Sequence, residues 1–202
     1  AGGVKGMTFD LTTQKTDYQG LQIGLIGRHQ LDNAATAVSA VELLSSIGVN
    51  IAKDAIYMGL RKVKWPGRLE VMGEKPTILI DGAHNIAGIK TLKTALEQYF
   101  YDKSKILVIG ILEDKDYEEM LKELIPMADT VICTAPDNPR ALSATRLSEA
   151  VANIFQKSQI KVYAEEKIEN AVKLAYSLAA AEDMIVFAGS LYMIGHVRTL
   201  LK

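Results

Sequence analysis

The chain has 202 residues, of which 49% are hydrophobic and 23% are charged, and its 23 Lys and Arg nearly balance its 24 Asp and Glu. This composition is typical of a globular protein and excludes a disordered, collagen-like or disulfide-rich chain. A net charge of −1 supplies no general attraction for nucleic acid or anionic lipid. The single cysteine, Cys133, excludes a disulfide within the chain, and no apolar stretch is long enough to span a membrane. We therefore expect a cytoplasmic protein with no nucleic-acid or membrane partner.

The first 64 residues contain two alternating stretches followed by two helical ones. Met7–Leu11 and Leu21–Leu25 alternate apolar and polar residues, which predicts the two strands of a hairpin. Asp32 precedes an apolar series that ends at Gly48, which predicts a helix with Asp32 as its cap, and Asp54 opens a second helix. We expect the hairpin to belong to a sheet whose other strands lie outside this sequence.

The sequence Trp65-Pro66-Gly67-Arg68 interrupts the helical pattern, because proline lacks an N–H donor and glycine permits a sharp turn. We therefore predict two domains, residues 1–64 and 65–202. Five strand-then-helix pairs follow, which predict an α/β fold with a mostly parallel, doubly wound sheet and helices on both faces. Arg68–Met72 is expected to add an edge strand. The five pairs are Thr77–Ile80 with Ala87–Tyr101, Ile106–Ile111 with Asp116–Ile125, Thr130–Thr134 with Ser143–Phe155, Lys161–Tyr163 with Lys167–Ala180, and Met184–Ala188 with Leu191–Leu201.

Polar loops follow these strands, and parallel sheets bind ligands at that edge because helix N-termini present free N–H groups there. The loop at 81–85 combines a carboxylate, an imidazole and an amide, so it either holds a ligand or forms a turn in which Asn85 caps the next helix. Asp116 and Ser190 each precede a predicted helix, so each either caps that helix or belongs to a loop that holds a ligand. Arg140 could bind a carboxylate or phosphate with its guanidinium fork.

Several familiar motifs are absent from the sequence. It has no Gly-x-x-x-x-Gly-Lys-[Ser/Thr] P-loop, no Gly-x-Gly-x-x-Gly and no Gly-x-Ser-x-Gly. The histidines, His29, His84 and His196, do not have the spacing of zinc ligands. These absences disfavour a dinucleotide-binding Rossmann domain and a metallohydrolase, and we expect no metal ligand in this chain. Composition and periodicity thus predict a doubly wound domain with a ligand-binding edge.

Three motifs in a characteristic order carry a resemblance to a known family. They are Gly-Arg-His-Gln-Leu-Asp-Asn-Ala-Ala-Thr-Ala at 27–37, Trp-Pro-Gly-Arg-Leu-Glu at 65–70 and Asp-Gly-Ala-His-Asn at 81–85. With these motifs the chain resembles the folylpolyglutamate synthase/dihydrofolate synthase family of the Mur ligase superfamily. Asp114-Lys115-Asp116, Pro139-Arg140-Ala141-Leu142 and Gly189-Ser190-Leu191-Tyr192 extend the resemblance over nearly the whole chain. One departure is Ile86, where the family usually has proline.

The resemblance implies a C-terminal fragment of a longer enzyme. Residues 1–64 would be the C-terminal part of an incomplete central ATPase domain, and residues 65–202 a Rossmann-like Mur ligase C-terminal domain. The P-loop and the Mg²⁺ ligands would lie in the missing N-terminal half, so the fragment alone is expected to be inactive. The complete enzyme would use ATP to phosphorylate the carboxylate of a reduced folate or dihydropteroate, and the amine of L-glutamate would attack the acyl phosphate.

The resemblance also implies roles for individual residues in ATP binding. Asn33 would hydrogen-bond the adenine, and Arg68 would reach the phosphates with its permanently charged fork. Asp81 would accept hydrogen bonds from the ribose hydroxyls. His84 would face the terminal phosphate and the incoming glutamate, so it is expected to be both nucleotide-binding and catalytic.

On the substrate side, the resemblance assigns Ser190 and Tyr192 to the orientation of the amino acid. Lys115 and Arg140 are candidates only by their place in the loops. Two alternatives remain beside the folate ligase. One is a free-standing nucleotide-binding or regulatory domain, which an upstream P-loop would exclude, and the other is a related Mur-type amide ligase that acts on a different carboxylate.

Overall fold

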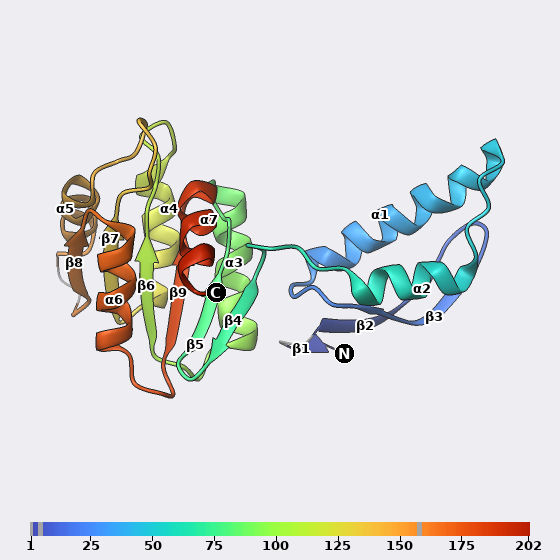
Figure 1. Cartoon of the computed structure of the whole chain (residues 1–202), viewed down its shortest axis with the longest axis horizontal. Coiled ribbons are helices and arrows are strands. Elements are labelled where there is room, and N and C mark those ends of the chain that lie inside the picture. Colours follow the sequence, from blue (N-terminus) through green and yellow to red (C-terminus); the bar gives the residue numbers. More distant parts are fainter. Residues whose placement is uncertain (1, 4–5, 157–158) are drawn as a thin grey trace. The chain divides into compact units, whose positions relative to one another are not determined.

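The computed structural model describes residues 2–3, 6–156 and 159–202. The chain divides into two compact units, which we call unit 1 (Ala1–Pro66) and unit 2 (Gly67–Lys202). The division falls inside the sequence Trp65-Pro66-Gly67-Arg68, where proline and glycine interrupt the helical pattern. Each unit has its own sheet and its own helices (Figure 1).

Unit 1 is a small antiparallel sheet covered by helices. Its strands are β1 (Gly2–Gly3), β2 (Gly6–Thr12) and β3 (Asp17–Ile23), and its helices are α1 (His29–Leu44), a 3₁₀ turn (Ser45–Ile47) and α2 (Lys53–Lys62). The pairing of β2 with β3 confirms the predicted hairpin. Alternate residues of β2, and Leu21 and Ile23 of β3, pack inward, so that Met7 and Ile23 meet Ala34, and Leu21 meets Val38 of α1. This alternation buries one face of the hairpin under the two helices.

The start of α1 differs from the prediction. The helix begins at His29, so Asp32 lies in its first turn and is not its cap. Gly27 has a φ of 103°, and its carbonyl accepts the N–H of Gln30 at 2.9 Å, so the chain turns into the helix earlier than the apolar series indicates. The predicted stop is confirmed, because Gly48 ends the following 3₁₀ turn with a left-handed φ of 86°.

Unit 2 has a six-stranded sheet in the order β4-β5-β9-β6-β7-β8. Only β4 is antiparallel to its neighbour, and the remaining pairs are parallel. This topology confirms the predicted α/β class with a mostly parallel sheet. The strands are β4 (Glu70–Glu74), β5 (Thr77–Ile80), β6 (Lys105–Ile109), β7 (Thr130–Thr134), β8 (Lys161–Glu165) and β9 (Met184–Ala188), and the helices are α3 (Ile86–Tyr99), α4 (Tyr117–Leu124), α5 (Ala144–Ile154), α6 (Ile168–Leu178) and α7 (Leu191–Leu200), with a 3₁₀ turn at Ile125–Met127.

Helices cover both faces of this sheet. On one face, α6 and α7 pack against alternate strand residues such as Ile80, Val108 and Phe187, which form one buried cluster with both helices. The helices α3, α4 and α5 lie on the opposite face (Figure 1). Cys133 in β7 is fully buried, and this burial raises the pKa of its thiol to about 12. Burial on both faces explains why β9 is a continuous apolar run and why β5 and β6 are apolar after their first residues.

The strands β5, β9 and β6 end side by side, which brings the loops that follow them into contact. Gly189, after β9, has a φ of 112°, and its N–H donates to the carbonyl oxygen of Ala83 at 2.9 Å. A Cβ atom on Gly189 would lie 2.5 Å from the carbonyl oxygen of Gly110, which follows β6. Both the backbone angle and the close approach therefore require glycine at position 189. No helix of the described residues is long and apolar enough to cross a membrane.

We expect Gly189→Ala to lower the free energy of unfolding by roughly 2 kcal/mol, because the added methyl group clashes with backbone and the left-handed angle is strained. The matched control is Gly195→Ala in α7, where a Cβ would meet nothing within 4 Å. This control should stabilise the chain by roughly 0.5–1 kcal/mol through helix propensity. Urea unfolding of the three proteins measures both changes, and equal stabilities would contradict the proposed close approach.

Candidate functional site

The carboxylate of Asp81 lies directly after β5 and joins two segments of backbone. Its Oδ2 accepts the N–H of Leu69 and its Oδ1 accepts the N–H of Ala83, both at 2.8 Å. The side chain is buried, with 7% of the residue surface exposed. Asp81 thereby fixes the turn at 67–69 against the loop at 81–85.

Two other predicted site residues, Arg68 and His84, lie close enough to Asp81 to influence its pKa. Burial raises the pKa of the Asp81 carboxyl, while the hydrogen bonds from Leu69 and Ala83 and the nearby charges of Arg68 and His84 oppose this rise. Arg68 itself is exposed, and His84 is half-buried. The structure therefore brings Arg68, Asp81 and His84 together at the C-terminal edge of the sheet.

The ring of His84 is held by its own loop. Its Nδ1 lies 2.8 Å from the carbonyl oxygen of Gly82. Since a carbonyl oxygen only accepts hydrogen bonds, Nδ1 carries the proton and donates it. The other ring nitrogen, Nε2, has no hydrogen-bond partner among residues 6–156 and 159–202, and it is available to contact a ligand as acceptor or, when protonated, as donor.

Two of the predicted helix caps are present in this region. Asn85 accepts the N–H of Gly88 with its Oδ1 at 2.8 Å and caps α3, as the turn interpretation of the 81–85 loop predicted. Ser190 caps α7 by accepting the N–H of Tyr192 at 3.2 Å. Ser190 is 2% exposed, whereas Tyr192 is 54% exposed. Both residues therefore stand beside the 81–85 loop, to which Gly189 is bonded.

The loops that follow β6 and β7 are joined by charges. Lys115 lies 2.7 Å and Arg140 3.5 Å from the carboxylate of Asp114, and the hydrogen bond from Lys115 holds the pKa of that carboxyl below its ordinary value. Arg146 and Glu113 form a further ion pair between the loop after β6 and α5. Asp116 stands at the N-cap position of α4, but its side chain makes no capping bond, so the interpretation of Asp116 as a side-chain cap is wrong.

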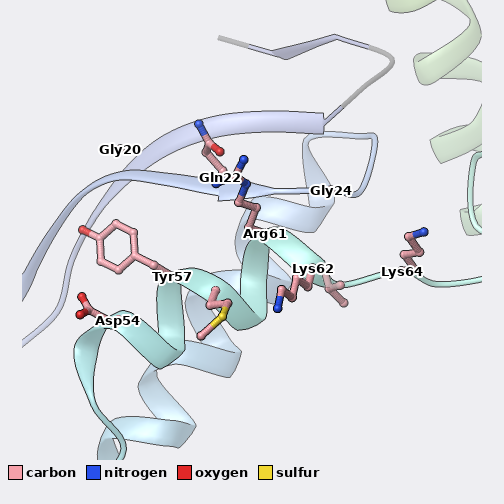
Figure 2. A pocket seen from close by; sticks show the side chains of 10 residues that line it. Gly20, Gln22, Gly24, Asp54, Tyr57, Arg61, Lys62 and Lys64 are labelled. Atoms are coloured by element: carbon pink, nitrogen blue, oxygen red, sulfur yellow. The ribbon is translucent and has the colours of Figure 1, made fainter.

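Asn33 lies in unit 1, on the first turns of α1. Its side chain is exposed, and its Nδ2 donates to Oε1 of the buried Gln30 at 3.0 Å. Asn33 therefore belongs to unit 1, whereas the other predicted site residues belong to unit 2. A separate pocket of about 860 Å³ lies between β3 and α2 and is lined by Arg61, Lys62 and Lys64 among others (Figure 2). None of the predicted site residues lines this pocket.

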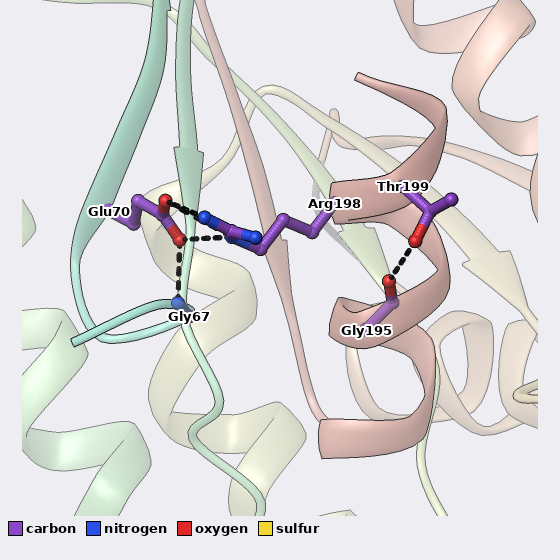
Figure 3. A network of polar contacts seen from close by, with 5 residues as sticks. All are labelled: Gly67, Glu70, Gly195, Arg198 and Thr199. Atoms are coloured by element: carbon purple, nitrogen blue, oxygen red, sulfur yellow. Dashed lines mark hydrogen bonds and ion pairs between the residues drawn. The ribbon is translucent and has the colours of Figure 1, made fainter. Parts of the chain in front are cut away.

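Two features at the C-terminal edge of the sheet in unit 2 were not predicted from the sequence. Glu70 receives hydrogen bonds from Arg198 of α7 and from the N–H of Gly67 (Figure 3). Arg198 carries no sequence signal for this contact, because 128 residues separate it from Glu70. The hydroxyl of Thr134, at the end of β7, is the other feature, since it is buried and has no hydrogen-bond partner among the described residues.

The groups around Asp81 are suited to an anionic ligand. Arg68 supplies a permanent positive charge, His84 supplies a donor at Nε2 when its ring is protonated, and the N-terminus of α3 adds the positive end of a helix dipole. Among residues 6–156 and 159–202 there is no group of three or more His, Cys, Asp and Glu that could hold a metal ion. The arrangement therefore favours contact with phosphate or carboxylate oxygens.

Comparison with known proteins identifies relatives of this fold. Residues 67–191 match the family model of the Mur ligase glutamate ligase domain. Dihydrofolate synthase/folylpolyglutamate synthase of Bacillus subtilis is 34% identical over 198 residues, which are 98% of this chain and 45% of that protein. Folylpolyglutamate synthase of Mycobacterium tuberculosis complexed with ADP superimposes with a TM-score of 0.87, at 33% identity over 98% of this chain and 46% of that one.

A third relative is Escherichia coli FolC in complex with DHPP and ADP, with a TM-score of 0.81 and 26% identity over 94% of this chain and 42% of that one. The chain thus spans about half the length of these relatives. The match to the family model extends over most of unit 2 and more than half of the whole chain. The chain therefore belongs to the Mur ligase family, of which unit 2 carries the glutamate ligase domain.

Proposed function

We propose that this chain is the C-terminal part of an ATP-dependent ligase that adds L-glutamate to a folate. The observation that carries the proposal is the gathering of Arg68, Asp81 and His84 beside the N-terminus of α3. The Bacillus subtilis relative is a dihydrofolate synthase/folylpolyglutamate synthase, and two relatives of known structure hold ADP. One of them also holds DHPP.

In this proposal residues 1–64 complete the ATPase domain of the longer protein and residues 65–202 form its ligase domain. The N-terminal half of the protein supplies the P-loop and the Mg²⁺ ligands, which are absent from this sequence. Mg²⁺ neutralises charge on the triphosphate when it is bound. A cytoplasmic location agrees with the use of ATP and with the free, buried thiol of Cys133.

The proposed nucleotide contacts are those that the resemblance implies, and each residue has hydrogen-bonding groups suited to its part of ATP. Arg68 binds phosphate oxygens with two N–H groups of its fork. Each carboxylate oxygen of Asp81 has used one of its two acceptor sites on a backbone N–H, so one site on each remains for a ribose hydroxyl. Asn33 hydrogen-bonds the adenine, for which its amide offers both a donor and an acceptor.

The reaction proceeds in two steps. The carboxylate oxygen of the folate attacks the terminal phosphorus of ATP, the bond to ADP breaks, and an acyl phosphate forms. The amine of L-glutamate then attacks the acyl carbon, loses a proton, and expels phosphate from the tetrahedral intermediate to leave an amide. Arg68 contacts the phosphates throughout both steps, whereas His84, when its ring is protonated, donates from Nε2 to the negative charge that builds up on the oxygens.

The amino acid is bound by the neighbouring loops of unit 2. Ser190 keeps its hydroxyl proton after capping α7, so it can donate to a carboxylate of L-glutamate. Tyr192 follows on the exposed side of the same turn. Lys115 and Arg140 provide two cations on the adjacent loops, and both already share Asp114 as a partner.

The first test measures amide formation by this chain and by the longer protein. With ATP, Mg²⁺, L-glutamate and either dihydropteroate or tetrahydrofolate, the longer protein should release phosphate and extend the folate. The chain alone should show no turnover, because it lacks the P-loop motif that aligns the triphosphate. Comparing the two folates separates the two ligase activities.

Three results would overturn parts of this proposal. Turnover by the isolated chain would show that no N-terminal half is needed. Turnover of the longer protein only with another carboxylate acceptor would identify a related Mur-type ligase. Nucleotide binding without turnover of any acceptor would identify a nucleotide-binding or regulatory domain.

In the longer protein, Arg68→Ala should reduce kcat/KM for ATP, because a charged phosphate contact is lost. The reduction should correspond to a free-energy loss on the order of 2 kcal/mol. Lys173→Ala is the matched control, since it removes an exposed cation from the middle of α6. Steady-state kinetics with varied ATP compare the two. Equal losses in both variants would mean that only general surface charge matters.

His84→Ala should lower kcat by more than it raises KM for ATP, because a contact made to charge in the transition state affects turnover. His196→Ala is the control, as its ring contacts Glu169 between α7 and α6 at 3.0 Å. Kinetics and thermal unfolding are measured on the same preparations. If His84→Ala lowers only the melting temperature and leaves kcat unchanged, His84 merely holds its loop and does not belong to the site.

A further inference from the structure

The turn that carries Arg68 has an unusual backbone on both sides of that residue. Gly67 has a φ of 70°, and Leu69 has a φ of 44°, the one left-handed angle among the described residues other than glycine. A left-handed conformation at a leucine is strained, so it persists only where surrounding contacts enforce it. The same conformation explains why β4 begins at Glu70 and not at Arg68, as the sequence predicted.

Three hydrogen bonds enforce this turn. The N–H of Gly67 donates to Oε2 of Glu70 at 2.7 Å, and the carbonyl oxygen of Gly67 accepts the N–H of Gly82 at 2.7 Å. The N–H of Leu69 donates to Asp81, and the Leu69 side chain is buried with 2% exposed. Arg68 is thus the exposed residue between two neighbours whose backbones are both fixed.

The carboxylate of Glu70 is in turn fixed by α7. Nε of Arg198 lies 3.1 and 3.0 Å from Oε1 and Oε2, and Nη2 lies 3.0 Å from Oε1 (Figure 3). Burial opposes ionisation of Glu70, but the hydrogen bonds from Arg198 and Gly67 outweigh it and hold the pKa below its ordinary value. The pair is therefore ionised at neutral pH, with both carboxylate oxygens engaged.

We infer that Glu70 and Arg198 are positioning residues for Arg68, which they set in the direction of the ATP phosphates by locking the turn at Gly67–Glu70. The inference rests on the proposed function, because it assigns a purpose to the direction of Arg68. Without the Glu70 carboxylate, the N–H of Gly67 loses its acceptor and the strained turn relaxes toward ordinary negative φ. That change rotates the Cα–Cβ bond of Arg68 and withdraws its guanidinium from the phosphate.

The test uses E70Q and R198K in the longer protein. E70Q removes the charge and one acceptor oxygen, whereas R198K keeps the charge but loses the planar fork. The matched control is E123Q, which breaks the 3.0 Å ion pair of Glu123 with Lys93 between α3 and α4. Kinetics with varied ATP separate KM from kcat for each variant.

E70Q should raise KM for ATP roughly tenfold and change kcat by less than about twofold, since a misplaced phosphate contact weakens nucleotide binding. R198K should produce a smaller rise, and E123Q none. Loss of folded protein alone would lower kcat in proportion to the active fraction and leave KM unchanged. That pattern in E70Q and R198K would overturn the inference.

A double-mutant cycle shows whether Glu70 acts through Arg68. In the R68A background, E70Q should add no further increase in KM, because the contact that it positions is already gone. Multiplicative effects would overturn the inference. If the wild-type protein shows no ATP-dependent ligation with any acceptor, the proposed function fails and this inference fails with it. If the wild-type protein ligates but E70Q leaves KM for ATP unchanged, only the inference is overturned.

Hydrogen exchange on the 202-residue chain supplies a readout that does not depend on activity. E70Q should speed exchange of the Gly67 and Leu69 amides relative to the wild-type chain, while E123Q should leave both unchanged. Unchanged exchange in E70Q would contradict the locking of the turn. Because this measurement reports on the turn directly, a loss of global folding in E70Q is recognised by faster exchange throughout unit 2.

Discussion

The carboxylate of Asp81 is the constraint on which the candidate site depends. It stands where β5 ends, takes one backbone N–H from its own loop and one from the turn at 67–69, and is shielded from water by both. A buried carboxylate requires such donors, because an unpaired charge in this position would be strongly unfavourable. By satisfying Asp81, the fold holds Arg68 and His84 near one carboxylate.

The parallel sheet provides the second requirement, which is a place where several loops meet. Pairing of Ile80 with Phe187 and of Ile109 with Ala188 makes β5, β9 and β6 end at one level. The loops then approach so closely that Gly189 has no space for a side chain next to Gly110. Helix N-termini and polar side chains are thereby concentrated at one edge, where a ligand can be held by groups that are distant in the sequence.

The sequence predicted the elements of unit 2 well, because each buried strand is a short apolar run and each helix has a clear period. It also predicted that Asp81 and His84 lie in one polar loop directly after a strand, which is where the structure has them. It could not identify Arg198 as the partner of Glu70, because nothing local marks a residue of the last helix for a contact 128 residues away. The early start of α1 was missed for a different reason. The helix starts at a turn formed by Gly27 and backbone hydrogen bonds, and no side chain caps it, so the usual sequence signal of a helix start is missing.

The fully buried thiol in β7 has a consequence for experiments on folding. Cys133 is the only cysteine of the sequence, and burial raises the pKa of its thiol to about 12, so the reactive thiolate is almost absent in the native state. A thiol reagent can reach the sulfur only when the sheet between α6 and α5 opens. The rate of alkylation at this single atom would therefore report rare openings of the sheet at β7, with no probe added to the protein.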